Sequence, residues 1–151
     1  MPIIEELRYA MRKRLSASEV ITATEFQAEG KNAPPQADFY IRETINTLDV
    51  TANFQNGTLH QFLVTYDIFA SRKVYSGITG KLYSAADIIT KEFAETPDKM
   101  LISLPDLPNC TAYLERLVQY GAIAQEEDLF HLPVQIYINV QERHEESEYL
   151  S

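Results

Sequence analysis

The sequence is poor in cysteine, in glycine and in long apolar runs, and each shortage excludes a class of protein. The one cysteine among 151 residues, Cys110, excludes an intrachain disulfide framework and a zinc site built on several cysteines. None of the five glycines belongs to a phosphate-binding loop, because the run Gly77-Ile-Thr-Gly80-Lys81 lacks the spacing and the Lys-Ser/Thr pair of that motif. No run of about 18 apolar residues occurs, so the sequence predicts no transmembrane helix. The charged N-terminus is unlike a signal peptide, and we expect a protein of a reducing cytoplasm.

Basic residues are scarce relative to acidic ones. The chain has 13 Lys and Arg against 22 Asp and Glu, a formal charge of −9, which argues against a surface that grips nucleic-acid phosphates. Four basic residues fall within the first fourteen, whereas eight acids and only two arginines follow from Glu115 onward. This asymmetry has two interpretations, solvated surface or complementary edges of neighbouring subunits. For the second, the candidate interface residues are Arg12, Lys13 and Arg14 on one side and Glu126, Glu127 and Asp128, or the Glu145-Glu146 tail, on the other.

Residues with catalytic or metal-binding chemistry are present but not in recognisable arrangements. The histidines are far apart, without the spacing of a metal site: His60, His131 and His144. Cys110 has no marked base nearby, so we expect a small buried hydrophobe rather than a nucleophile. Asp67 interrupts an apolar strand pattern. Either its face is partly wet or paired with Lys or Arg, or it forms a catalytic carboxylate pair, for example with Asp87. The sequence thus predicts no enzyme, no metal and no cofactor.

Two segments have the apolar spacing of amphipathic helices. The first covers residues 2–15, where Pro2 suits the first turn and the basic residues suit the C-terminal end of the helix dipole. The second covers residues 81–95 and is stopped by Thr96-Pro97. Their apolar stripes consist of Ile4, Leu7, Met11 and Leu15 in the first helix and Leu82, Ala85, Ala86, Ile89 and Phe93 in the second.

The clearest strand signal is a hairpin around Asn56-Gly57, a pair that readily supplies the positive φ values of a type I′ turn. Its return strand, 59–69, is apolar on much of both faces, which is typical of a central strand. The segment 110–120 fits either a helix or a strand, and a polar loop with paired prolines covers residues 29–36. Alternating or short apolar patterns predict further strands at residues 19–27, 38–45, 48–54, 100–104 and 129–141.

The order of these segments predicts an α+β fold, because helices and strands do not alternate as they do in βαβ units. We expect one domain over residues 1–151, an antiparallel or mixed β-sheet with two main α-helices packed on one face. Residues 142–151 are predicted to form a flexible acidic tail. The chain also has nine tyrosines and seven phenylalanines, and aromatic side chains left on the outer sheet face would favour a protein interface.

Five segments follow one another in a distinctive order. They are Arg12-Lys-Arg-Leu15 in the opening helix, the Pro34-Pro35 loop leading to Phe39-Tyr-Ile-Arg42, the strand Phe62-Leu-Val-Thr-Tyr-Asp-Ile-Phe69, the helix Ser84-Ala-Ala-Asp-Ile-Ile-Thr-Lys-Glu-Phe93 and the strand Leu132-Pro-Val-Gln-Ile-Tyr-Ile-Asn-Val140. This order resembles that of the tail terminator, or tail completion, proteins of long-tailed bacteriophages and prophages, which include the minor tail protein U type. The resemblance spans most of the chain.

The resemblance implies a hexameric ring that sits on top of the tail tube, stops its polymerisation and presents a surface to the head. The implied partners are further copies of the chain, the tail tube protein and a head–tail connector protein. The implied locations are the host cytoplasm during assembly and then the virion tail. A ring through which DNA passes should not grip phosphates, which agrees with the acidic composition. Two other interpretations stay open: another head-closure, connector or minor tail protein, and a small-ligand-binding α+β module.

Overall fold

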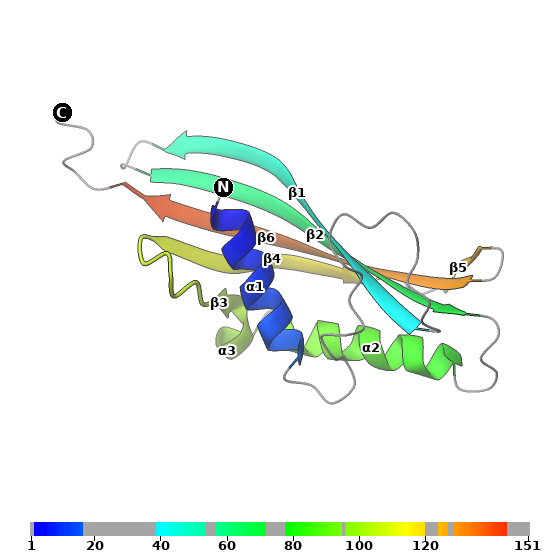
Figure 1. Cartoon of the computed structure of the whole chain (residues 1–151). Helices are drawn as coiled ribbons and strands as arrows, with labels where there is room; N and C mark the ends of the chain where they lie inside the picture. Colours follow the sequence, from blue (N-terminus) through cyan, green and yellow to red (C-terminus); the bar gives the residue numbers. More distant parts are fainter. Residues whose placement is uncertain are drawn as a thin grey trace.

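The computed structural model describes residues 2–16, 39–53, 57–71, 78–94, 96–119, 124–126 and 129–144. In chain order its elements are α1 (Pro2–Ser16), β1 (Phe39–Asn53), β2 (Gly57–Ser71), α2 (Ile78–Glu92), α3 (Pro97–Met100), β3 (Leu101–Ile102), β4 (Cys110–Gln119), β5 (Ala124–Glu126) and β6 (Leu129–Arg143) (Figure 1). The strand expected at residues 19–27, the loop expected at 29–36 and residues 145–151 of the acidic tail lie outside the described residues.

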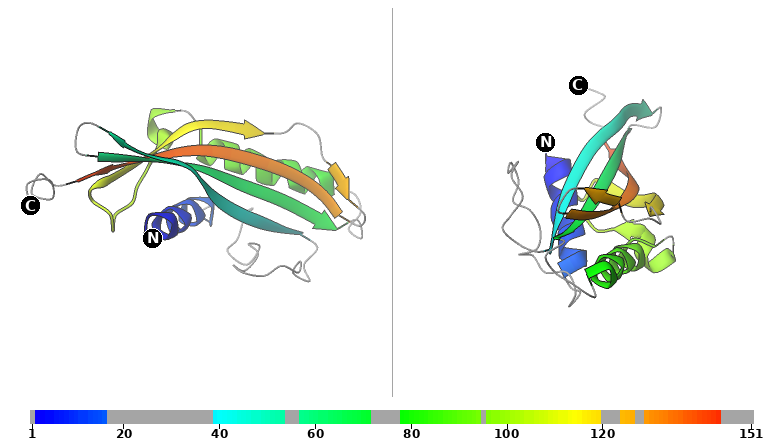
Figure 2. Two further views of the ribbon diagram at one scale, coloured as in Figure 1. Left: turned by 90° about the horizontal axis from the view of Figure 1, so that it is seen from above. Right: turned by 90° about the vertical axis from the view of Figure 1, so that its right-hand side faces the viewer.

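Five of the strands form one antiparallel sheet in the order β1-β2-β6-β4-β3, and the short β5 pairs with β6. The sheet is twisted along its length, and α1 and α2 lie on one of its faces (Figures 1 and 2). The predicted α+β fold, with two main helices packed on one face of an antiparallel sheet, is therefore confirmed.

Alternate residues of the two central strands attach the sheet to the helices. In β2 the even-numbered side chains from Phe62 to Ala70 are buried, while most of the odd-numbered ones are partly exposed. The even-numbered side chains of β6 are likewise buried from Leu132 to Val140. A period of two places such residues on one face, as the sequence predicts for both strands. The register of β2 and β6, which pairs Phe62 with Ile138, brings the two buried rows side by side.

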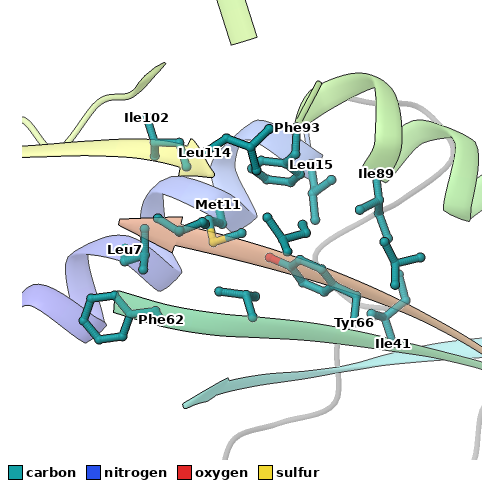
Figure 3. Packing of buried hydrophobic residues seen from close by; sticks show 14 of the residues in the cluster. Leu7, Met11, Leu15, Ile41, Phe62, Tyr66, Ile89, Phe93, Ile102 and Leu114 are labelled. Atoms are coloured by element: carbon teal, nitrogen blue, oxygen red, sulfur yellow. The ribbon is translucent and has the colours of Figure 1, made fainter. Parts of the chain in front are cut away.

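Both helices turn their apolar stripes toward this face of the sheet (Figure 3). In α1 the side chains of Leu7, Met11 and Leu15 are fully buried. The fourth buried position belongs to Ile3 rather than to Ile4, because Ile3 continues the same four-residue step. The five stripe residues predicted for the second helix are all buried, four of them in α2 and Phe93 directly after its last residue. One hydrophobic cluster unites them with α1 and the sheet.

Several element boundaries differ from those expected. The strands expected at 38–45 and 48–54 are one continuous strand, β1, because a register shift between Thr47 and Asp49 lets both halves pair with β2. The second helix begins three residues earlier than expected, at Ile78, and ends at Glu92 rather than at residue 95. The strand expected at 100–104 shortens to the two residues of β3, since Met100 ends α3.

The ambiguous segment 110–120 is a strand, β4. It pairs with β6, with a register shift between Leu114 and Arg116. Ala112 and Leu114 are buried on the helix face of the sheet. Pairing with β6 decides the matter, because it places these apolar side chains in the common core, whereas the periodicity of the segment fits both states.

At one end of the sheet the strands extend past the helices (Figure 1). The predicted hairpin is confirmed by the pairing of β1 with β2 as far as Asn53 and Gly57, although its turn lies outside the described residues. On this end Leu48 and Val50 are each 53% exposed. β6 also continues to Arg143, so the first two residues of the expected tail belong to the sheet.

Replacement of Ile89 by aspartate should unfold the protein. Ile89 is fully buried between α2 and the sheet, and a buried carboxylate without a partner costs several kcal/mol, a large part of the stability of a domain. The same change at Ser84, which is exposed on the same helix, is the control and should melt close to wild type. Thermal unfolding followed by circular dichroism compares them, and an Ile89→Asp variant that melts like wild type would contradict the helix face described above.

Candidate functional site

The three basic residues near the end of α1 have different environments. Arg12 lies over an acidic residue of the sheet, Arg14 contacts the ends of α2 and α3, and Lys13 is exposed. Successive residues of a helix point about 100° apart, so three neighbours in sequence cannot share one face. The sequence predicted one basic patch of Arg12, Lys13 and Arg14, but the helix directs the three side chains to different surroundings.

Arg12 belongs to a buried ionic cluster around Glu43 of β1. Its Nε donates a hydrogen bond to Glu43 Oε1 at 3.0 Å, and Nε of Arg8 lies 3.3 Å from the same oxygen. The hydroxyl of Tyr66 donates to Glu43 Oε2 at 2.8 Å. Arg8 and Arg12 are four residues apart on α1, so both reach one carboxylate. The cluster attaches α1 to the first two strands of the sheet.

Burial sets the protonation of this cluster. It raises the pKa of Glu43 above its ordinary value, against the opposing effects of the Tyr66 hydroxyl and the two arginines. Burial and the neighbouring carboxylate raise the pKa of Tyr66 well above its ordinary value, so the phenol keeps its proton and remains a donor. The side chain of Glu43 is fully buried, whereas those of Arg8 and Arg12 keep 20% and 36% of their surface exposed.

Arg14 joins three elements through backbone carbonyls. Its Nη1 donates to the carbonyl oxygens of Glu92 and Lys99, each at 2.9 Å, and its Nη2 donates to that of Leu101 at 2.7 Å. The guanidinium carbon lies 5.2 Å from the ring centre of Phe93. Burial lowers the pKa of Arg14, with Glu92 opposing the shift, but a guanidinium stays charged in proteins. A cation at the C-terminal ends of helices also suits their dipoles.

Lys13 lies at the rim of a groove between α1 and the segment that follows β3, which we call the α1–β3 groove. Its volume is about 380 Å³, and its lining consists of Tyr9, Ala10, Lys13 and Arg14 from one side and Ile102, Ser103 and Pro105 from the other. One large apolar side chain of this lining is open to solvent, Tyr9 at 62% exposure. Exposed apolar side chains gathered beside polar ones mark interaction surfaces.

The acidic candidates lie elsewhere. Glu126 ends β5, which Figure 1 places at the end of the sheet opposite the β1–β2 hairpin, whereas α1 lies toward the hairpin end. Glu127, Asp128 and the pair Glu145-Glu146 lie outside the described residues. The described part of one chain therefore does not bring Lys13 and Glu126 together, and a contact between them needs two copies.

The sheet face away from the helices carries an aromatic cluster that the sequence does not predict. Phe69 lies between the rings of Tyr40 and His131, with ring centres 4.9 Å and 4.5 Å away, and the Arg42 guanidinium carbon lies 5.3 Å from its ring centre. His131 Nε2 is 2.6 Å from Asp67 Oδ1. Asp67 is thus partly exposed and paired, as one interpretation of its position required, but with a histidine of β6 rather than with Lys or Arg.

The remaining reactive side chains do not converge. Asp87 is exposed on α2, across the sheet from Asp67, so the catalytic pair weighed in the sequence is not formed. Cys110 is half-buried, and burial together with Glu142 raises the pKa of its thiol, the opposite of an activated nucleophile. The two other histidines are hydrogen-bonded, His60 to Glu142 at 3.1 Å and His144 to Thr58 at 2.8 Å. Among the described residues no group of three His, Cys, Asp or Glu side chains could hold a metal ion. No helix within them has the length and apolarity needed to cross a membrane.

Comparison with known proteins identifies the fold. No protein-family model matches the sequence, and no curated protein matches it. A solved structure whose name states no function is similar with a TM-score of 0.61 and 14% identity, over 93% of this chain and 97% of its own. A chain from the virion of a native gene transfer agent particle is similar with a TM-score of 0.54 and 13% identity, over 89% of this chain and 94% of its own. These likenesses establish a shared fold over most of the chain.

Removal of the Glu43 side chain should destabilise the protein more than its conversion to an amide. Glu43→Ala leaves the Tyr66 hydroxyl and two arginines without their acceptor and should lower the free energy of unfolding by about 3–5 kcal/mol. Glu43→Gln keeps an acceptor for Tyr66 and should lower it less. Urea unfolding measures both, and equal losses would contradict this assignment of the Tyr66 hydrogen bond.

The same residue predicts a pH dependence. Because folding raises the pKa of Glu43 above its ordinary value of 4.5, the folded state holds the proton more firmly than the unfolded state. The contribution of Glu43 to stability is therefore greatest below the ordinary value and falls as the pH rises through the folded pKa. Glu43→Gln should lack this slope in urea unfolding at a series of pH values. A free energy of unfolding of wild type that rises with pH relative to that of this variant would contradict the direction.

Arg14→Ala should lower the free energy of unfolding by about 2–3 kcal/mol, because three carbonyls lose a charged donor. Lys13→Ala, the matched control at the next position, should change it by less than about 0.5 kcal/mol, since Lys13 is exposed. Arg14→Lys should fall between them, because an ammonium group does not reproduce the planar fork. Urea unfolding of the three variants tests this, and equal losses for Arg14→Ala and Lys13→Ala would exclude the joining role of Arg14.

Proposed function

We propose that this chain is a structural protein of virion assembly, and more specifically a ring-forming phage tail terminator. In this role it caps the tail tube, stops its polymerisation and offers the surface that joins tail to head. The observation that carries the proposal is the likeness of fold, over 89% of the chain, to a chain of a gene transfer agent virion. The order of segments that resembles the tail terminators, from α1 to the long strand β6, supports the finer assignment.

A ring closes through heterologous contacts, in which two different patches of the chain meet. The positions of Lys13 and Glu126 support such a contact, because α1 and β5 lie toward different ends of the sheet and the two residues differ in charge (Figure 1). Exposed apolar side chains supply further contact surface. They are Tyr9 on α1, Leu48 and Val50 on the hairpin, and Leu101 on β3.

Arg12 and Arg14 make their contacts within the chain, so they are removed from the candidate cations for an ionic contact between subunits. Both arginines hold α1 to the rest of the chain, through Glu43 and through backbone carbonyls respectively. Lys13 is then the interface cation of the three. An exposed ion pair contributes about 0–1 kcal/mol, so ionic contacts would act together with apolar ones.

The partners in this proposal are further copies of the chain, a tail tube protein and a head–tail connector protein. The ring would be hexameric, as the resemblance implies. It would assemble in the host cytoplasm and remain in the virion tail.

The purified chain should sediment as a ring, and Lys13→Glu should shift it toward the monomer. The shift should be larger at low than at high salt, because ions screen exposed charges. Lys91→Glu, the same charge change in the last turn of α2, is the control and should leave assembly unchanged. Sedimentation velocity at low and high salt makes the comparison, and a ring that responds to neither salt nor Lys13→Glu would exclude the ionic contact.

Added to polymerising tail tube subunits, the protein should shorten the tubes seen by negative-stain electron microscopy. Its rings should appear at tube ends, because a terminator binds the last ring of subunits and blocks further addition. Tubes of unchanged length, with a chain that stays monomeric at high concentration, would exclude the terminator role.

A further inference from the structure

We infer, on the basis of the proposed function, that the α1–β3 groove is the docking site for the acidic segment 145–151 of a second copy of this chain. Neighbouring subunits would then be joined by a segment of one inserted into a groove of the next. The groove, the segment and the direction in which β6 runs each support this contact.

The groove has the chemistry of a peptide site. Of the two cations that line it, Lys13 is exposed, whereas the guanidinium of Arg14 donates to backbone carbonyls of its own chain. Apolar wall is supplied by Ala10, Ile102 and Pro105. Its volume of about 380 Å³ is at the lower end of the range for ligand pockets, which suits a few side chains of an extended segment. Tyr9 stands at its rim with most of its surface in solvent. Such a groove selects a ligand that carries acids beside large apolar side chains.

Segment 145–151 has this composition. Its sequence is Glu-Glu-Ser-Glu-Tyr-Leu-Ser, in which three acids precede the pair Tyr149-Leu150. The other acidic run, at 126–128, is followed by Leu129-Phe130, but these two residues belong to β6 and Phe130 packs against the core. The described apolar side chain that follows that run, Phe130, is therefore already used in packing against the core. Of the two acidic candidates in the sequence, the groove matches 145–151.

The direction of β6 carries the segment away from the groove of its own chain. Ile102 pairs with Ala112, and Ala112 pairs with Val140, so the β3 wall of the groove is level with Val140. β6 continues past this level to Arg143, which adds about 10 Å at 3.3 Å per residue. Figure 1 shows this end of β6 extending past α1 and β3.

A return to Ile102, the β3 residue of the groove in the same chain, exceeds the reach of the segment. Tyr149 stands five residues after His144, a distance of about 17 Å when fully extended. The return needs a reversal, which uses a four-residue turn. It then needs more than about 10 Å back along the strand and about 10 Å across β4 and β3. The groove of a second copy has no such restriction, and an exchange of this kind is heterologous, as ring closure requires.

The test uses the full chain with its own segment disabled by Tyr149→Ser and Leu150→Ser. A fluorescent peptide of residues 144–151 should bind this variant in anisotropy titrations. Adding Tyr9→Ala should weaken binding about tenfold, as loss of an apolar anchor does. Adding Lys13→Glu should weaken it severalfold, and more at low salt. The matched controls, Tyr83→Ala and Lys91→Glu, make the same changes at exposed positions of α2 outside the groove lining and should leave affinity unchanged.

Measuring peptide binding at several protein concentrations distinguishes a groove filled by its own chain from one filled by a neighbouring chain. The wild-type chain should bind the labelled peptide when dilute and lose this binding as it assembles, because neighbours then fill the groove. Exclusion of the peptide to the same extent at every concentration would mean that each chain fills its own groove, and would overturn the inference. Peptide binding that is unchanged by both groove variants, Tyr9→Ala and Lys13→Glu, would overturn the inference as well.

The oligomeric state of the variants distinguishes a failure of the docking contact from a failure of the terminator role. Tyr149→Ser with Leu150→Ser should shift the chain toward the monomer in sedimentation. Rings that form normally with these changes would overturn the docking contact and leave the terminator role standing. Conversely, a wild-type chain that binds the peptide through Tyr9 and Lys13 but forms no ring would support the groove as a site and count against the terminator role.

Discussion

The structure depends on the burial of one face of β2 and β6 beneath α1 and α2. These two strands are each 15 residues long and pair along their whole length, so the even-numbered side chains from Phe62 to Ala70 and from Leu132 to Val140 form one continuous, largely apolar surface. The hydrophobic effect drives that surface out of water, and the two helices supply the apolar stripes that cover it. Polar groups on this face must find partners inside the protein. Glu43 and Tyr66 are such groups: the Tyr66 hydroxyl donates to Glu43, and Arg8 and Arg12 of α1 form ion pairs with the same carboxylate.

The same requirement determines which charges reach the surface. Two of the three basic residues near the end of α1 are used internally, Arg12 on a buried carboxylate and Arg14 on the carbonyls where α2, α3 and β3 meet. Lys13, between them, points to solvent beside a groove whose lining includes the exposed side chain of Tyr9. The residues available for an interaction surface are therefore those that make no contacts inside the chain. Counting charges along the sequence does not identify them.

The two faces of the sheet differ in their polar side chains. The helix face is apolar apart from the cluster at Glu43 and the hydrogen-bonded groups near the hairpin end. The other face mixes the stacked rings around Phe69 with the Asp67–His131 pair and partly exposed polar side chains. This division is expected of an antiparallel sheet with one face on the core.

The sequence by itself determined the elements with a strong local period: both helices and their stripes, the central hairpin, the inner faces of β2 and β6, and the α+β class. Tertiary structure alone decided that 110–120 is a strand, that Glu43 receives Arg12 and that Asp67 pairs with His131. The physical reason is distance along the chain. A period reports which side chains of one element share a face, whereas these pairs join residues 31 and 64 positions apart. Such contacts exist only after the hydrophobic core has brought the elements together.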